Sequence, residues 1–455
     1  MLKDLTRTEL LAKYDVPAPR YTSYPTVPYW SENPTSAQWI AALQQTFAQN
    51  PDTPWSLYIH IPFCESLCTF CGCNTFITQN HDNERTYTKA IHQEWESYLA
   101  QVPQLKTAPI RQIHLGGGTP TFFSGKSLKR LLEPIMAMVN LDPAKFEGSI
   151  EVGPRVTSRE HLEALRELGF QRISMGVQDF NPEVQHLINR IQPYEMTRDL
   201  TLLAREVGFE SVNYDLIYGL PAQTLDSFRE TAVTTINLRP DRIALYSFAF
   251  VPWIKKAHRL FTEDDLPKGA DKRALYEIAR ELFLEAGYVE LGLDHFALPD
   301  DNLYRAYEQG ELHRNFMGYT DMRTDILLGL GVSSISEAPT CFHQNEKLIS
   351  SYKKRALAGE IPTLRGHLLD AEDQQQREQI LQFMTQQQVA LHDEAQVEDV
   401  RGYLAELLHD GLVKIDGWEL AMTERGRPFL RNAAMALDMR LRRNKPDTRV
   451  FSQSV

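Results

Sequence analysis

The chain has little cysteine and no long hydrophobic run. Only five of its 455 residues are cysteine, an odd number that argues against a disulfide framework and favours a reducing compartment. No stretch approaches the ~20 apolar residues that cross a bilayer. Charged residues interrupt the N-terminal string MLKDLTRTEL, where a secretory signal would need an apolar segment. We therefore expect a cytoplasmic protein without a membrane partner.

An excess of positive charge is also missing. The formal net charge is −12 at pH 7, which works against nonspecific attraction to nucleic acid or to an anionic membrane. The apolar fraction of 42% and the charged fraction of 24% are ordinary for a globular protein. A chain of this length has room for one large catalytic domain and one or two smaller units.

Short β-rich segments recur along the first part of the chain, and a helical pattern follows each of them. They lie at 55–61, 111–115, 148–152, 171–177, 211–217 and 242–248. Apolar residues at helical spacing support helices at 125–139 and 158–168 between them. Because strands that alternate with helices form parallel sheets, the sequence predicts an α/β fold with a partial parallel (β/α)6 barrel.

The barrel is expected to span 51–270, after an N-terminal arm at 1–50. The arm contains the string RYTSYPTVPYW, which prolines interrupt too often for a helix or a long strand. Residues 271–360 begin with a helical pattern near 272–286 and include the glycine-rich string LLGLGVSSIS. They are expected to extend the barrel and to cover its site.

The remaining residues, 361–455, predict a mostly helical C-terminal domain. Helices are expected near 370–386 and 395–409, followed by a hairpin across Gly417 and a final helix near 425–442. This order is shared with winged-helix modules. The segment contains more acidic than basic residues, which disfavours DNA binding.

Four cysteines lie in the string CESLCTFCGC, directly after the first predicted strand. Structural zinc usually needs a second Cys or His pair further along the chain, and Cys341 stands alone. A structural metal or an electron-carrier cluster remains an alternative.

The spacing C-x3-C-x2-C, with Phe70 before the third cysteine, is typical of the radical S-adenosylmethionine (SAM) superfamily. In that superfamily three thiolates hold a [4Fe–4S] cluster, whose fourth iron binds SAM and whose electron cleaves it to a hydrogen-abstracting radical. Cys64, Cys68 and Cys71 are therefore the predicted ligands.

Polar or glycine-rich residues follow several of the predicted strands. Gly116, Gly117 and Gly118 follow the second strand in HLGGGTPT and would let the backbone approach a ligand closely. Glu151, Gln178 and Asp215 lie near the ends of the third, fourth and fifth strands. Single carboxylates are usually solvated or salt-bridged. Because catalytic residues of barrels gather at the carboxyl ends of the strands, three consecutive strand ends indicate a site.

Motifs along nearly the whole chain resemble those of the oxygen-independent coproporphyrinogen III oxidases. They are RYTSYP, YIHIPFCESLCTFCGCN, HLGGGTPT, ISMGVQDFN, NYDLIYGLP, DHFALPDD and LHRNF with GYT one residue later. The resemblance implies oxidative decarboxylation of two propionates of coproporphyrinogen III to vinyls, giving protoporphyrinogen IX in haem biosynthesis. It also implies one [4Fe–4S] cluster, two SAM molecules, a small electron-donor protein such as flavodoxin or ferredoxin, no nucleic acid partner, and a monomer.

The resemblance also assigns roles to single residues. Tyr58 and Glu151 are implied to be catalytic and, with Gly117 and Ile335, to contact the cluster-bound SAM. The positions implied to surround a second SAM are Phe70, Gly118, Thr119, Gln178, Arg190, Asp215 and Ala249. Cys73 matches a family cysteine that does not bind the cluster.

Two residues depart from the family pattern, and two other functions remain open. Gly153 stands where the family commonly has Asp, and Met317 where it has Gln, near the second SAM. A related haem chaperone keeps the cluster loop but typically lacks the fourth cysteine and the RYTSYP arm, both present here. A cluster-dependent regulatory protein would bind DNA through its winged-helix-like tail, which the acidic composition disfavours.

Overall fold

A large mixed sheet forms the centre of the protein, and the predicted six parallel strands are neighbours within it. The computed structural model describes residues 5–253, 255–446 and 450–454. The strand order is β9-β8-β7-β6-β4-β1, and all five pairs are parallel. The bounds are β1 (Trp55–Ile61), β4 (Pro109–Gly117), β6 (Glu147–Val152), β7 (Phe170–Gln178), β8 (Ser211–Tyr218) and β9 (Arg242–Ser247). The prediction of a partial (β/α)6 barrel is confirmed.

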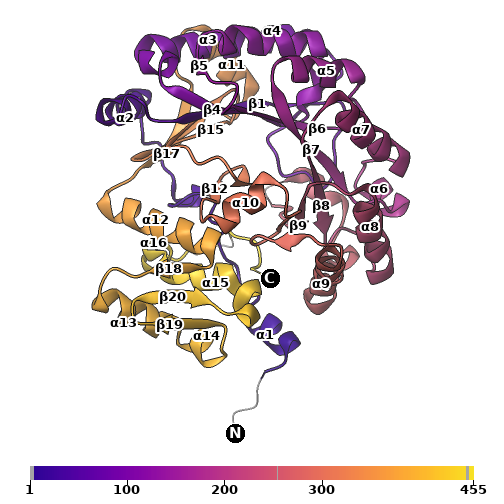
Figure 1. The fold of residues 1–455 in the computed structure, drawn as a ribbon, viewed down its shortest axis with the longest axis vertical. Helices are drawn as coiled ribbons and strands as arrows, with labels where there is room; N and C mark the ends of the chain where they lie inside the picture. Colours follow the sequence, from indigo (N-terminus) through magenta and orange to yellow (C-terminus); the bar gives the residue numbers. More distant parts are fainter. Residues whose placement is uncertain (1–4, 254, 447–449, 455) are drawn as a thin grey trace.

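Helices cover the outer side of these strands (Figure 1). They are α3 (Asp82–Gln101), α4 (Gly125–Met136), α5 (Arg159–Glu167), α6 (Pro182–Leu187), α7 (Tyr194–Val207) and α8 (Leu225–Leu238). In α4, leucines at 128, 131 and 132 share one face and are fully buried against the sheet. Ser124 accepts a hydrogen bond from the Ser127 N–H at the start of α4, which fixes where the helix begins. The two predicted helices of this region, 125–139 and 158–168, are confirmed.

The glycine-rich string LLGLGVSSIS extends the sheet on the other side of β1. Its first half is β14 (Ile326–Leu330), which runs parallel to β1, and its end begins β15 (Ile335–Ala338). Gly331 lies in the sharp turn between them with φ of 96°, a conformation that favours glycine. The sheet then continues through β16 (Cys341–Asn345) and β17 (Thr363–Leu368), with α11 (Ile349–Leu357) between them in the chain.

An antiparallel pair forms the opposite edge of the sheet. The helix predicted near 272–286 is α9 (Gly269–Glu285), and β10 (Val289–Glu290) and β11 (His295–Ala297) follow it. Strand β11 pairs with β9. A separate hairpin of β12 (His313–Asn315) and β13 (Gly318–Thr320) comes after α10 (Asn302–Glu308).

The N-terminal residues contain two helices that the sequence reading did not predict. Helix α1 (Arg7–Tyr14) packs into the C-terminal part, whereas α2 (Ser36–Gln49) packs into the barrel core through Trp39, Leu43 and Phe47. The prolines break helical structure only between these two helices. Residues 5–50 therefore contact two different cores, and the irregular arm is their middle part.

The C-terminal residues form a small second core around a three-stranded sheet. The elements are α12 (Ala371–Gln386), β18 (Gln388–Ala390), α13 (Glu394–Tyr403), α14 (Ala405–His409), β19 (Val413–Asp416) and β20 (Glu419–Met422). The hairpin across Gly417 is confirmed, and the helix expected at 395–409 is interrupted at Leu404.

The single helix expected near 425–442 is wrong. This segment consists of short 3-10 turns, α15 (Leu430–Ala434) and α16 (Met439–Arg443). Pro428 lies in the first turn, and it cannot donate a helical hydrogen bond. Asp438 leaves helical geometry with ψ of 84° and caps α16 through the Leu441 N–H. Apolar spacing alone did not reveal these breaks.

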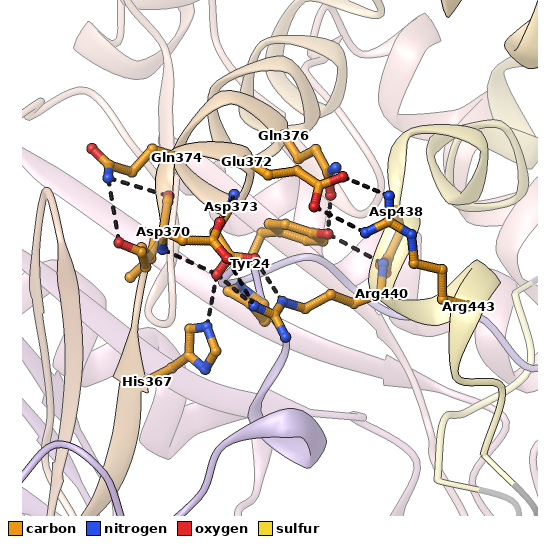
Figure 2. Close-up of polar contacts among 12 residues, drawn as sticks. Tyr24, His367, Asp370, Glu372, Asp373, Gln374, Gln376, Asp438, Arg440 and Arg443 are labelled. Atoms are coloured by element: carbon orange, nitrogen blue, oxygen red, sulfur yellow. Dashed lines mark hydrogen bonds and ion pairs between the residues drawn. The ribbon is translucent and has the colours of Figure 1, made fainter.

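A polar network fastens the RYTSYP arm to this second core (Figure 2). The Asp373 carboxylate accepts hydrogen bonds from Arg440 Nε at 2.6 Å, Arg440 Nη2 at 2.7 Å and His367 Nε2 at 2.9 Å. The Tyr24 hydroxyl donates to Gln376 on the same helix. Tyr21 and Tyr24 are themselves part of the buried second core. The arm is therefore held by both apolar packing and hydrogen bonds.

Asp373 should be a main support of this network. Burial alone would raise the pKa of its carboxyl, but the hydrogen bonds from His367 and Arg440 lower the pKa to about 2. We predict that Asp373→Asn lowers the free energy of unfolding by about 2 kcal/mol, because it removes charge from a buried, paired site. The wild type should lose this contribution as the pH falls from about 4 to about 2, since the lowered pKa lies below the ordinary value of 3.8.

The neighbouring Glu372 offers a matched control. It also makes a two-pronged ion pair, with Arg443, but both side chains are about half exposed. Glu372→Gln should change the free energy of unfolding by less than about 0.5 kcal/mol. Urea unfolding followed by tryptophan fluorescence measures both variants. Equal losses in the two would contradict the importance assigned to Asp373.

Candidate functional site

The cysteine loop leaves the carboxyl end of β1 and brings its thiols toward residues from other strand ends. Cys64 Sγ lies 3.4 Å from Thr119 Oγ1, which follows the glycines after β4. Arg155 and Arg190 each donate to Cys68 Sγ at 3.6 Å. The two guanidiniums thus place positive charge beside that sulfur.

Cys71 differs from Cys64 in its ease of ionisation. A hydrogen bond from the Cys73 side chain lowers the pKa of Cys71 to about 6, whereas burial raises the pKa of Cys64 to about 11. Cys73 thus lies within hydrogen-bonding reach of a predicted ligand. An iron cluster would deprotonate all three predicted ligands, since a coordinating thiol loses its proton to the metal.

The donor set fits an iron–sulfur cluster better than a single metal ion. Within the described ranges, no group of three His, Cys, Asp or Glu side chains converges as ligands of one ion would. Each thiolate of a cluster binds a different iron, so three cysteines on one loop need not meet at a point. Structural zinc, the alternative left open by the sequence, would need such a group, and the part of the chain that the structure describes contains none.

A cavity of about 80 Å³ lies inside the barrel and is lined by residues of β4, β6, β7, β8 and β9. Glu151 from β6 and Asp215 from β8 both line it. Glu151 Oε2 accepts the Gly117 N–H at 3.1 Å, and its Oε1 lies 3.6 Å from His114 Nε2. Asp215 accepts hydrogen bonds from Asn213 Nδ2 at 2.9 Å and Ser174 Oγ at 3.2 Å. Two predicted carboxylates therefore meet in one cavity.

Asp215 is held in an unfavourable electrostatic position. Burial, and after it repulsion from Glu151, raises the pKa of its carboxyl to about 7. A positively charged ligand in the cavity would relieve this repulsion, because an opposite charge within a few ångströms favours ionisation. The cavity therefore suits a cation such as SAM, which carries a sulfonium and an ammonium group.

Tyr58 lies on β1 at the side of this cavity. Its hydroxyl is 3.0 Å from His60 Nδ1, and its ring stacks 5.9 Å from His114. Phe316, from the β12–β13 hairpin, meets the Tyr58 ring edge-on at 4.8 Å. Ile335 lies on β15, and its carbonyl oxygen approaches Gly329, the β14 residue that pairs with Tyr58. These contacts bring together the positions implied to surround the first SAM.

The three glycines are required by the protein's own packing. A Cβ on Gly116 would lie 2.9 Å from the Tyr58 ring, and one on Gly117 would lie 2.8 Å from the His60 ring. One on Gly118 would lie 2.6 Å from the Pro62 carbonyl oxygen. The N–H of Gly117 donates to Glu151, and that of Gly118 to Ile61. The close approach expected of a ligand is thus already made by protein atoms.

The positions implied to surround a second SAM are less tightly grouped. Gln178 and Arg190 meet at Gly176, whose carbonyl accepts from Arg190 Nη2 at 2.7 Å. The Phe70 carbonyl accepts from His258 Nε2 at 3.1 Å. Ala249, after β9, lines a different cavity from the one that contains Asp215.

Both departures from the family pattern lie at cavities. Met317 lines the barrel cavity with Asp215, so an apolar thioether stands where the family commonly has an amide. A Cβ on Gly153 would lie 3.1 Å from Thr119, the residue in contact with Cys64.

Sequence reasoning missed several residues of the site. His60 and His114 contact Tyr58 and Glu151, and Arg155 contacts Cys68. A signal for the first two was available, because alternation along a strand places Tyr58 and His60 on the same face. Arg155 comes from a loop, and its contact had no sequence signal.

This fold and site define a radical SAM enzyme, and comparison with known proteins agrees. The model of the Radical SAM superfamily matches residues 58–234. The chain is 38% identical to oxygen-independent coproporphyrinogen III oxidase of Synechocystis, over 98% of this chain and 97% of that protein. It is 39% identical to the oxidase of that name from Escherichia coli, over 95% of each.

A solved structure identifies the family within the radical SAM superfamily. Coproporphyrinogen III oxidase from Escherichia coli, itself described as a radical SAM enzyme, superposes with a TM-score of 0.87. The match covers 93% of this chain and 98% of that one at 38% identity. The chain belongs to the family of oxygen-independent coproporphyrinogen III oxidases.

The cysteines provide the first test of the site. We predict that Cys64→Ser, Cys68→Ser or Cys71→Ser abolishes the cluster, because each removes one of only three thiolate ligands. Cys73→Ser should keep it, as should Cys341→Ser, a buried cysteine outside the loop. Iron content and visible absorption after anaerobic reconstitution measure this. An iron-free Cys73 variant beside an iron-loaded Cys71 variant would overturn the assignment.

The carboxylates provide the second test. Asp215→Asn should weaken SAM binding about 10-fold at pH 8 while leaving cluster content unchanged, since it removes a charged acceptor. Wild-type affinity should rise as the pH increases through about 7, where the Asp215 carboxyl ionises. Glu151→Gln should weaken SAM binding and move this rise to lower pH, because it removes one cause of the raised pKa. Asp226→Asn, at an exposed position on α8, is the control. Unchanged SAM affinity in both carboxylate variants would contradict the proposed site.

Proposed function

We propose that this protein carries out the oxygen-independent oxidative decarboxylation of coproporphyrinogen III to protoporphyrinogen IX in haem biosynthesis. The observation that carries the proposal is the similarity over nearly the whole chain to oxidases of that name. Each of two propionates becomes a vinyl by losing one β-hydrogen atom, carbon dioxide and one electron. The hydrogen leaves with the adenosyl part of SAM, so two decarboxylations consume two SAM molecules, and the released electrons need an acceptor.

We propose that Cys64, Cys68 and Cys71 hold one [4Fe–4S] cluster. When bound, the reduced cluster and SAM supply the hydrogen-atom abstraction that begins each decarboxylation. The first SAM would contact Tyr58, Gly117, Glu151 and Ile335. The second SAM would contact Phe70, Gly118, Thr119, Gln178, Arg190, Asp215 and Ala249. Support comes from the carboxylates in the barrel cavity and from the contact between Cys64 and Thr119, which follow β1 and β4.

The chain's own residues orient and enclose the reactants. Gly117 and His114 hold the Glu151 carboxylate from two sides, so that it can accept a hydrogen bond from an ammonium group in a fixed direction. Tyr58 and Glu151 are proposed as the catalytic residues on this basis. The β12–β13 hairpin covers the cavity through Met317, Tyr319 and Thr320, which helps to exclude water from a reactive radical site.

We further propose that a small electron-donor protein, such as flavodoxin or ferredoxin, docks over the cysteine loop. Leu67 in this loop and Phe76 and Ile77 beside it are 40%, 41% and 41% exposed and offer apolar contact to such a partner. A monomer is proposed because one chain supplies every residue of the site.

No described helix has the length and apolar character to span a bilayer. A cytoplasmic location is proposed from the five free cysteines, which favour a reducing compartment.

The domain limits are also proposals: an arm at 1–50, a barrel at 51–270, an extension at 271–360 and a C-terminal domain at 361–455. The separate buried clusters of the barrel and of the C-terminal elements support the last division. The packing of α2 on the barrel argues that the first limit lies closer to residue 35.

The reaction is tested by anaerobic assay of the reconstituted protein with SAM, dithionite, coproporphyrinogen III and an electron acceptor. Two molecules of 5′-deoxyadenosine should form for each protoporphyrinogen IX. Binding of the substrate should weaken with added salt, because carboxylates pair with cationic side chains. If 5′-deoxyadenosine forms without vinyl product while haem binds tightly, the oxidase function is wrong and a haem chaperone takes its place.

A further inference from the structure

A second cavity, of about 70 Å³, lies between the barrel and the C-terminal elements and is rich in arginine. We call it the arginine pocket. Its walls come from α1, the RYTSYP arm, α9, the turn between β10 and β11, and the residues around α15. The arginines that line it are Arg7, Arg20, Arg273, Arg280, Arg427 and Arg431. None of the roles assigned above uses this pocket.

The positive charges of the pocket exceed the negative ones. Glu290 pairs with Arg280 at 2.8 Å, and Asp294 pairs with Arg20. Glu277 forms ion pairs with both Arg7 and Arg273. Glu424 lies 3.6 Å from Arg427, but its own side chain is 85% exposed, so that pair is weak. Among the described residues, six guanidiniums therefore share four carboxylates.

Arg431 is the buried guanidinium of this pocket whose hydrogen-bond partners, among the described residues, are all neutral. It is only 5% exposed. Its Nε donates to the Pro19 carbonyl at 3.0 Å and its Nη1 to the Gln453 carbonyl at 2.7 Å. The carbonyls of Ala18 and Ser452 are further neutral partners. Burial, and after it repulsion from Arg20, lowers the pKa of this guanidinium to about 9. An anion in the pocket would offset the cost of burying this charge.

The arginine pocket adjoins the mouth of the barrel. Tyr218 and Ser247, the last residues of β8 and β9, line it at the sheet edge that also holds the active site. Arg20 lies 5.8 Å from the ring centroid of Tyr246, and Tyr246 lines the barrel cavity together with Asp215. The Tyr246 side chain thus lies next to both Arg20 of the arginine pocket and the barrel cavity.

We propose that the arginine pocket binds the propionate carboxylates that the reaction leaves intact. This inference rests on the proposed function, since a substrate with four carboxylates keeps two of them after both decarboxylations. Those two need cationic partners throughout, and guanidinium groups match carboxylates in planar, two-pronged pairs. The substrate would be held at its unreactive side while the reactive propionates enter the barrel.

The test uses the reconstituted holoenzyme with Arg280→Gln and Arg427→Gln combined. KM for coproporphyrinogen III should rise at least about 10-fold while kcat and the KM for SAM change less than about twofold, since binding and not chemistry is affected. Arg401→Gln, at an exposed position on α13, is the matched control and should leave KM unchanged. If the double variant does not take up its cluster, Arg427→Gln alone should still raise KM about threefold.

Inorganic phosphate distinguishes substrate binding from general anion binding. Phosphate should inhibit the wild type competitively against coproporphyrinogen III, and this inhibition should weaken in the double variant. Competitive inhibition with an unchanged KM in the variant would mean that the pocket holds a different anion, and the proposal would fall. An active wild type whose variants keep the same KM would also overturn it. An inactive wild type would instead contradict the proposed function itself.

Discussion

The parallel alignment of six neighbouring strands is the constraint on which the site depends. Parallel strands place all their carboxyl ends at one edge, so segments far apart in the chain meet there. The cysteine loop follows β1, the three glycines end β4 or directly follow it, and Glu151 and Asp215 lie toward the ends of β6 and β8. A shift of one residue in any of these strands would turn its polar side chain away from the cavity.

Electrostatic asymmetry is the second feature that the fold creates. The barrel cavity contains two carboxylates close enough to raise the pKa of Asp215, which suits a cationic cofactor. The arginine pocket beyond Tyr246 has the opposite charge, which suits an anionic substrate. The RYTSYP arm connects the arginine pocket to the C-terminal core, because Arg20 lines the pocket while Tyr21 and Tyr24 are buried in that core. Under the proposal for the arginine pocket, placement of the arm affects substrate binding as well as folding.

The sequence predicted the parallel strands and the cysteine loop well, because both depend on local patterns. Short β-rich segments, each followed by a helical pattern, mark the strands, and the cysteines of the motif lie within one short loop. The contact of Arg155 with Cys68 and the arginine pocket could not be predicted, since their residues are distant in sequence. The prediction of a single final helix was wrong because apolar spacing continues across Pro428 and Asp438, where the backbone departs from helical geometry. Helix α2 was missed because the prolines before it dominated the reading of the arm.

The central claim is that three cysteines leave one iron of the cluster open to SAM at the carboxyl edge of the sheet. Mössbauer spectroscopy of the 57Fe-reconstituted protein tests it most directly. Addition of SAM should change the isomer shift and quadrupole splitting of one iron in four, and the other three should keep their values. A spectrum in which no iron responds to saturating SAM would contradict this account.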